Sequence, residues 1–222
     1  MELIVLDGLD GSGKSTQIEL LEQNLKKLGR KVRMISFPDY ANESSALVKL
    51  YLSGAFGKDA FSVNAYAASS FYAVDRYASY KQFWQKDYEE GVTIIAARYT
   101  TSNAIHQMSK LPREEWDSYL AWLEDYEYRK LGLPRPDAVL FLDMKPEVSA
   151  RLISSRYRGD ESRRDIHEKN KKYLHECTAS AHYAGEKLGF HMIACDDGET
   201  PYPIEVIQQK ILECVRKELN LC

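Results

Sequence analysis

Gly8-Leu9-Asp10-Gly11-Ser12-Gly13-Lys14-Ser15 is the stretch of this chain that says most about its fold. It follows the apolar run Leu3 to Asp7, which has the length of a strand, and it leads into Lys14 to Leu28, which has the apolar spacing of a helix. The letters match GxxxxGK[ST], the pattern of a phosphate-binding loop between a strand and a helix. An ordinary glycine-rich turn is the alternative, and both flanking elements argue against it. The sequence therefore predicts a nucleoside triphosphate site.

The chemistry of such a loop assigns roles to its residues. Glycines let successive N–H groups turn toward phosphate oxygens, and the helix that follows adds the positive end of its dipole. Lys14 is expected to neutralise the β- and γ-phosphates, and Ser15 to offer its hydroxyl to Mg²⁺. The predicted cradle consists of Gly8, Asp10, Gly11, Ser12, Gly13, Lys14, Ser15 and Thr16.

The rest of the chain alternates short apolar runs with longer periodic segments. Further strands are predicted at Val32 to Phe37, Val92 to Ala97, Ala138 to Asp143 and His191 to Cys195. Further helices are predicted at Asn64 to Glu90, Pro146 to Ser155, Asp165 to Leu188 and Pro203 to Leu219. This alternation predicts a P-loop NTPase fold in one α/β domain, residues 1–222. Its parallel sheet has about five strands, with helices on both faces and ligands at the carboxyl ends of the strands.

Composition favours small-molecule partners. The chain has 222 residues, 44% of them hydrophobic, and a formal net charge of -3. No long Lys/Arg run marks a nucleic-acid binder, and no apolar stretch approaches the roughly 18 residues that span a membrane. The N-terminus lacks the pattern of a secretion signal. Because the four cysteines form no CxxC pair, reduced thiols are expected instead of a zinc or redox site, as in a cytoplasmic protein.

A phosphate-binding loop does not by itself separate ATPases, GTPases, motors and small-molecule kinases. Ordered motifs elsewhere make the choice: Phe37-Pro38-Asp39-Tyr40, Tyr72-Ala73-Val74-Asp75-Arg76, Arg98-Tyr99 with Ser102-Asn103, and an Arg-rich segment ending in Asp165-Ile166-His167-Glu168. With these motifs the sequence resembles the thymidylate kinase family over about the whole chain. The resemblance implies ATP-dependent, Mg²⁺-assisted phosphorylation of dTMP to dTDP. It also implies a homodimer, for which the apolar helix Asn64 to Trp84 is a candidate face, although ordinary burial within one subunit explains this helix as well.

Tyr72 and Arg76 are the candidates for gripping the base. They lie four residues apart and so share one face of a helix, which lets a ring stack on the base while a guanidinium bonds its carbonyl edge. The resemblance assigns them to thymine. The alternative is a core Tyr72 with Arg76 as its solvated neighbour, and Phe71 is a second candidate for the stacking ring.

Other acceptor-site roles come from the resemblance. Asp10 corresponds to the aspartate that accepts the sugar 3′-hydroxyl near Mg²⁺, although loop capping is an alternative. Phe37 and Pro38 are expected to wall the monophosphate site, and Tyr40 to reach the acceptor phosphate.

Four positions that follow the third predicted strand complete the expected site. Arg98 fits the arginine that bridges acceptor and donor phosphates, where bidentate geometry matters. Asn103 corresponds to a position that reads the pyrimidine edge. His106 and Gln107 follow one helical turn later, near the deoxyribose and base, although His106 is equally compatible with an exposed surface histidine.

The segment from Arg156 to Arg164 is predicted to be a mobile lid. A phosphoryl transition state needs positioned cations from an element that excludes water, although charge runs are usually solvated faces. Because Gly11 and Ser12 supply no arginine to the phosphate loop, the sequence resembles the thymidylate kinases whose catalytic arginine comes from the lid. The candidates are Arg156, Arg158, Arg163 and Arg164, with Arg151 about one turn earlier, and Asp165 and His167 are expected to contact substrate.

One position departs from the family pattern. The residue before Arg98-Tyr99 is Ala97, where the family has aspartate, and a methyl group neither holds hydrated Mg²⁺ nor orients an arginine. Asp7 together with Asp10 is a candidate substitute. Two alternatives therefore stay open: a kinase for another deoxynucleoside monophosphate, and a catalytically impaired relative that only binds nucleotides.

Overall fold

The computed structural model describes residues 1–156 and 171–220. Its strands form one parallel sheet in the order β2-β3-β1-β4-β5. They are β1 (Glu2–Gly8), β2 (Val32–Ser36), β3 (Thr93–Ala97), β4 (Ala138–Asp143) and β5 (His191–Ala194). All five predicted strands are confirmed, each with ends that differ by at most one residue.

The helices fill the intervals between the strands. They are α1 (Lys14–Lys27), α2 (Ala46–Leu52), α3 (Ala65–Ser79), α4 (Gln85–Glu89), α5 (Thr101–His106), α6 (Trp116–Glu124), α7 (Pro146–Arg156), α8 (Lys171–Leu188) and α9 (Ile204–Glu218). Two π-helical segments continue α3 and α6, namely η3 (Tyr80–Trp84) and η6 (Asp125–Lys130). Single 3₁₀ turns lie at η1 (Glu43–Ser45), η2 (Ala60–Ser62), η4 (Met108–Lys110) and η5 (Arg113–Glu115).

Most of the predicted helices are present, with differences in detail. The segment predicted from Asn64 to Glu90 is divided into α3, η3 and α4. Of the helix predicted from Asp165, the part before α8 lies outside the described residues. The short helices α2, α5 and α6 were not predicted.

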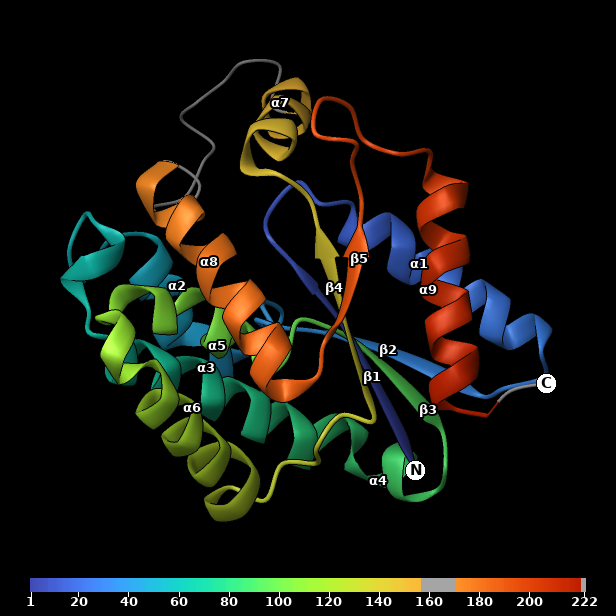
Figure 1. Cartoon of the computed structure of the whole chain (residues 1–222). Helices are drawn as coiled ribbons and strands as arrows, with labels where there is room; N and C mark the ends of the chain where they lie inside the picture. Colours follow the sequence, from blue (N-terminus) through green and yellow to red (C-terminus); the bar gives the residue numbers. More distant parts are fainter. Residues whose placement is uncertain (157–170, 221–222) are drawn as a thin grey trace.

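Helices cover both faces of the sheet and create two hydrophobic cores. α1 and α9 lie on one face, and α3, α5, α6 and α8 lie on the other (Figure 1). Because successive strand residues point to opposite faces, Leu3 and Val5 of β1 belong to one core, and Ile4 and Leu6 to the other. The near-continuous apolar runs of the strands follow from this two-sided burial.

The strand order brings the loops after β1 and β3 together. From β1 the chain crosses to β2 and returns to β3, which lies between them, and β4 then lies on the other side of β1. In open parallel sheets, ligands bind outside the carboxyl ends of the strands at such a reversal. Among the described residues, no helix is both long and apolar enough to cross a membrane.

Candidate active site

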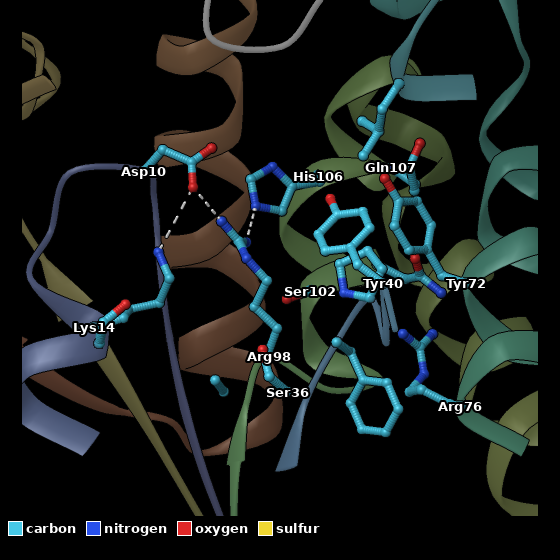
Figure 2. A pocket seen from close by; sticks show the side chains of 16 residues that line it. Asp10, Lys14, Ser36, Tyr40, Tyr72, Arg76, Arg98, Ser102, His106 and Gln107 are labelled. Carbon is cyan, nitrogen blue, oxygen red and sulfur yellow. Dashed lines mark hydrogen bonds and ion pairs between the residues drawn. The ribbon is translucent and has the colours of Figure 1, made fainter. Parts of the chain in front are cut away.

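A cavity of about 280 Å³ lies where β1, β2 and β3 end. Most of the residues predicted to bind nucleotides line it: Asp10, Lys14, Ser15, Phe37, Pro38, Tyr40, Tyr72, Arg76, Arg98, Asn103, His106 and Gln107. Ser36 and Leu52 also line it, and nothing in the sequence singled them out. Figure 2 shows Asp10, Lys14, Arg98 and His106 on one side of the cavity, and Tyr40, Tyr72 and Arg76 on the other. The sheet therefore brings two groups of predicted residues to one place.

The phosphate loop lies beside this cavity and has the backbone that its glycines allow. Gly11 and Gly13 have φ angles of 80° and 88°, in the left-handed region that other residues rarely adopt. A Cβ at Gly11 would also lie 2.8 Å from the carbonyl oxygen of Ser149 in α7. Gly13, the N-cap of α1, has no side chain with which to make a capping hydrogen bond. The positive end of this helix is thus arranged to take an anion.

Lys14 folds back along the loop that precedes it. Its Nζ donates 2.8 Å hydrogen bonds to the carbonyl oxygens of Gly8 and Leu9, and lies 3.9 Å from the carboxylate of Asp10. The ammonium group is therefore held at the mouth of the loop, between the phosphate cradle and the cavity (Figure 2).

Arg98 joins the loop to the cavity. Its Nη2 donates to Asp10 at 2.6 Å, and its Nη1 lies 3.7 Å from Asp7. Burial disfavours the charge of this side chain, but Asp10 and Asp7 outweigh that effect and raise the pKa of Arg98 above its usual value. The residue has a φ of 65°, which is rare for a residue with a side chain and typical of functional sites. Arg98 is thus a permanent, firmly oriented cation.

Asp7 supports the turn that carries Arg98. Its side chain is inaccessible to solvent and accepts hydrogen bonds from the backbone of Gly8 at 2.9 Å, from Thr101 at 3.0 Å and from Ser102 at 2.6 Å. These bonds tie the end of β1 to the first turn of α5. Asp7 and Asp10 together supply the carboxylates around Arg98 that Ala97 does not.

His106 is fixed in one tautomer by its neighbours. A guanidinium only donates, so the 2.7 Å contact between Arg98 Nη1 and His106 Nε2 makes Nε2 an acceptor. In the neutral ring Nδ1 then carries the proton, and it lies 3.6 Å from Sγ of Cys177 in α8. Because the ring is 8% exposed, the alternative of a surface histidine is wrong. His106 thus holds one terminal nitrogen of Arg98 while Asp10 holds the other.

The far end of the cavity contains a buried ion pair. Arg76 in α3 is 1% exposed and donates to both oxygens of Glu127 in η6, from Nε at 2.7 Å and from Nη2 at 2.5 Å. Burial opposes its charge, and Glu127 outweighs burial and raises the pKa of Arg76. The alternative of a solvated Arg76 is therefore wrong. Tyr72 lines the cavity, whereas Phe71 packs against the rings of Tyr51 and Phe56.

The segment after β2 forms the remaining wall. Phe37 donates its N–H to the carbonyl of Ala97 at 2.9 Å, and its ring packs on Tyr99. Tyr40 is 54% exposed at the cavity rim. Asp75 of α3 holds this segment by accepting from the backbone N–H of Asp39 at 2.8 Å.

The predicted lid, residues 156–164, lies outside the described residues except for Arg156. Its candidates Arg158, Arg163 and Arg164 are therefore not described, and neither are Asp165 and His167. Arg156 ends α7, and its side chain is not described. Arg151, one turn earlier, donates to the carbonyl of Glu199, in the loop between β5 and α9.

The described residues fit a nucleotide with its magnesium better than a metal held by protein alone. No group of three or more His, Cys, Asp or Glu side chains within residues 1–156 and 171–220 is placed to hold a metal ion. Mg²⁺ commonly binds through one or two protein oxygens together with substrate phosphates. Ser15 and Asp10, both at the cavity, are of that kind, and the buried Ser12 Oγ in the loop lacks a hydrogen-bond partner in the described structure.

Comparison with known proteins identifies the family of this chain. The family model for thymidylate kinase matches residues 6–211. The chain belongs to the thymidylate kinase family. It is 34% identical to the thymidylate kinase of Mycobacterium tuberculosis over 160 residues, which are 71% of each chain. It is 30% identical to the Homo sapiens enzyme over 143 residues, 64% of this chain and 61% of that one.

A solved structure supports the fold independently. The structure of thymidylate kinase from Candida albicans aligns with a TM-score of 0.72 and 21% identity, covering 99% of this chain and 92% of that one. This likeness confirms the predicted P-loop fold. Thymidylate kinases are nucleoside monophosphate kinases, so the chain is a phosphotransferase by family.

Proposed function

We propose that this chain transfers the γ-phosphoryl group of ATP to dTMP, giving ADP and dTDP. The observation that carries the proposal is the position of Arg98. It hydrogen-bonds Asp10 of the phosphate loop, and it lines the same cavity as Tyr72 and Arg76. One arginine therefore contacts both halves of a two-nucleotide site.

The donor half holds the triphosphate. N–H groups of the loop and of the first turn of α1 bind phosphate oxygens, and Lys14 neutralises the β- and γ-phosphates. Ser15 and Asp10 would hold Mg²⁺, which would offset the charge that develops on those phosphates. We assign the donor site to Gly8, Asp10, Gly11, Ser12, Gly13, Lys14, Ser15 and Thr16, with Ser15 and Asp10 nearest the metal.

The acceptor half holds the monophosphate. Tyr72 stacks on the base, Arg76 and Asn103 bond its edge, and Asp10 accepts the sugar 3′-hydroxyl. Further contacts come from Phe37, Pro38, Tyr40, His106 and Gln107 and, from the sequence alone, Asp165 and His167.

Transfer is a direct in-line displacement. An oxygen of the acceptor phosphate forms a bond to the γ-phosphorus, while the bond from that phosphorus to the β-γ bridging oxygen breaks and leaves its electron pair on ADP. Arg98 and Lys14 position the reacting oxygens and screen their negative charge, and Asp10 holds Arg98 in place. From the sequence we assign the remaining catalytic cation to Arg156, Arg158 or Arg163.

We propose that the chain works as a single kinase domain, residues 1–222, in a cytoplasmic homodimer. Tyr66, Val74 and Tyr77 are exposed along α3, and Phe83 is exposed on η3, which supports this helix as the dimer face. Free thiols at Cys177 and Cys195 suit a reducing compartment.

A panel of acceptors tests the function. Purified protein is assayed with Mg·ATP and with dTMP, dAMP or dGMP, and formation of ADP and of the nucleoside diphosphate is measured. We expect dTMP to have the highest kcat/KM. A higher value for a purine nucleotide would identify a kinase for another monophosphate. Nucleotide binding without turnover would identify a catalytically impaired relative.

A further inference from the structure

Glu127 is a buried carboxylate that meets two of the cavity's side chains at once. It lies in η6, is 0% exposed and does not itself line the cavity. Its Oε1 accepts from Nη2 of Arg76 at 2.5 Å and from Nδ2 of Asn103 at 2.9 Å, and its Oε2 accepts from Nε of Arg76 at 2.7 Å. Arg76 and Asn103, which come from α3 and α5, are therefore brought together at one oxygen atom.

This pairing fixes what Arg76 presents to the cavity. The fork of Nε and Nη2 is engaged by the carboxylate, so the plane of the guanidinium is set, and Nη1 is left to donate elsewhere. A guanidinium never accepts a hydrogen bond. The wall at Arg76 is thus a donor of fixed direction.

The same carboxylate fixes the amide of Asn103. Its Nδ2 faces Glu127 Oε1 and, at 3.3 Å, the carbonyl oxygen of Ser69. Both partners only accept, so the amide cannot turn over without placing oxygen against oxygen. Its two N–H groups are used inside the protein, and Oδ1 is left to accept. The wall at Asn103 is thus an acceptor.

We infer that Glu127 sets the base specificity of the acceptor site, by holding a donor at Arg76 beside an acceptor at Asn103. This inference rests on the proposed function. The complementary ligand edge is a carbonyl next to a ring N–H, which a 4-oxo pyrimidine presents at O4 and N3. A 4-amino pyrimidine presents the reverse pattern, a donor next to a ring acceptor. Thymine and uracil therefore fit, and cytosine is mismatched at both positions.

Burial makes the mismatch costly. Arg76 and Asn103 are each 1% exposed, so water does not replace a bond that the base fails to make. Sites built to hydrogen-bond a polar group discriminate strongly against analogues without it. Uracil lacks only a methyl group of thymine, a difference that binding sites discriminate much more weakly.

The first test uses the natural chain with Mg·ATP and dTMP, dUMP or dCMP. We expect kcat/KM for dCMP to be at least about 100-fold below that for dTMP, with dUMP in between. Equal use of dCMP and dTMP would overturn the specificity inference and leave the kinase function intact. Absence of turnover with any acceptor would instead overturn the proposed function.

The second test is Glu127→Gln, which separates specificity from stability. With its N–H₂ at the Oε1 position, the introduced glutamine faces both Asn103 and Nη2 of Arg76, and the Asn103 amide then turns its own N–H₂ toward the base. With its N–H₂ at the Oε2 position, it faces Nε of Arg76 and turns the guanidinium instead. We expect the ratio of kcat/KM for dTMP to that for dCMP to fall at least about tenfold, while KM for ATP stays within about threefold. A purely structural role would lower kcat/KM for dTMP and for dCMP by the same factor. An unchanged ratio would therefore overturn the inference.

Two further variants complete the design. Glu124→Gln makes the same charge change about one turn earlier, at a half-exposed residue paired with Arg135, and its acceptor ratio should not change. If Glu127→Gln does not fold, judged by far-ultraviolet circular dichroism, Glu127→Asp is used instead, because it keeps the charge opposite Arg76 and draws the carboxylate back from Asn103. The same fall in the ratio is expected there, and an unchanged ratio overturns the inference.

Discussion

The contacts of Arg98 reduce the effect on activity of having Ala97 where the family has aspartate. Asp10 at 2.6 Å, His106 at 2.7 Å and Asp7 at 3.7 Å already surround the guanidinium. An aspartate at position 97 would add one more carboxylate to an arginine that is already oriented. The natural chain is therefore expected to be active, with its orientation of Arg98 supplied by the ends of β1 and α5.

Ala97→Asp tests this directly. We expect kcat for phosphoryl transfer from ATP to dTMP to rise by less than about threefold, because the new carboxylate duplicates existing contacts. Asp10→Asn, which removes the negative charge nearest to Arg98, should lower kcat at least about tenfold in the same assay. A gain of about tenfold in Ala97→Asp would contradict the argument and show that the missing carboxylate limits the chemistry.

Among the elements, α3 organises the acceptor side through a residue next to Arg76. Asp75 is 0% exposed and accepts from the backbone N–H of Asp39 at 2.8 Å and from the hydroxyl of Ser44 at 2.6 Å. These bonds hold the segment between β2 and α2, which carries Phe37, Pro38 and Tyr40. The helix thus contributes Arg76 to one wall of the cavity, and through Asp75 it holds the segment that forms another wall.

Asp75→Asn should therefore weaken acceptor binding more than donor binding. Hydrogen bonds to a charged group contribute about 1.5–3 kcal/mol, so losing the charge is expected to raise KM for dTMP about tenfold. KM for ATP should change less than about threefold, because the phosphate loop is untouched. Glu90→Gln, a carboxylate change at the exposed end of α4, is the matched control. Equal increases in both KM values would show a general loss of structure instead.

The elements also show what sequence patterns reveal. The strands were predicted within one residue because buried parallel strands are continuous apolar runs bounded by glycine and polar residues. α5 was missed because its six residues are too few to show a helical period. The phosphate loop and Arg98 were found because their roles leave short local motifs.

Long-range pairs leave no such motif. Glu127 was missed because its partner Arg76 lies 51 positions away and no local pattern marks a carboxylate in a helical segment as buried. The burial of His106 was equally invisible, since Tyr173 and Cys177 of α8 cover it from far along the chain. These contacts depend on packing between α3, α5, η6 and α8, which only the assembled fold specifies.

At the scale of the whole molecule, the titration of Lys110, a partly buried lysine, affects stability. Lys110 Nζ donates to the hydroxyl of Tyr51 at 2.6 Å and to the carbonyl of Val63 at 3.2 Å. Burial lowers the pKa of Lys110 to about 7, although Cys177 and Asp59 act in the opposite direction. An unfolded lysine titrates near 10.4, so between pH of about 7 and 10.4 the unfolded chain binds more protons than the folded one. Stability from this group rises with pH across that window and is lost as pH falls toward 7.

Lys110→Met should remove that dependence. We expect the free energy of unfolding in urea to change less between pH of about 7.5 and 9.5 in the variant than in the natural chain, by a difference on the order of 2 kcal/mol. Lys26→Met, at an exposed residue paired with Glu22, serves as the control. Identical pH dependence in Lys110→Met and the natural chain would contradict the argument.

The exposed face of α3 is the proposed contact between the two chains of a dimer. Val74 and Tyr77 are 48% and 39% exposed and lie three residues apart, so they belong to one side of the helix. If this side is the dimer face, Val74→Glu with Tyr77→Glu should bury two like charges at the contact and shift the protein to monomers in sedimentation-velocity experiments. Ile204→Glu with Val206→Glu introduces the same charges at similarly exposed residues of α9, and should leave the natural dimer intact. Dimers that persist in the α3 variant, or are lost in both variants, would refute this face, because a contact through α3 is sensitive to the first pair of substitutions alone.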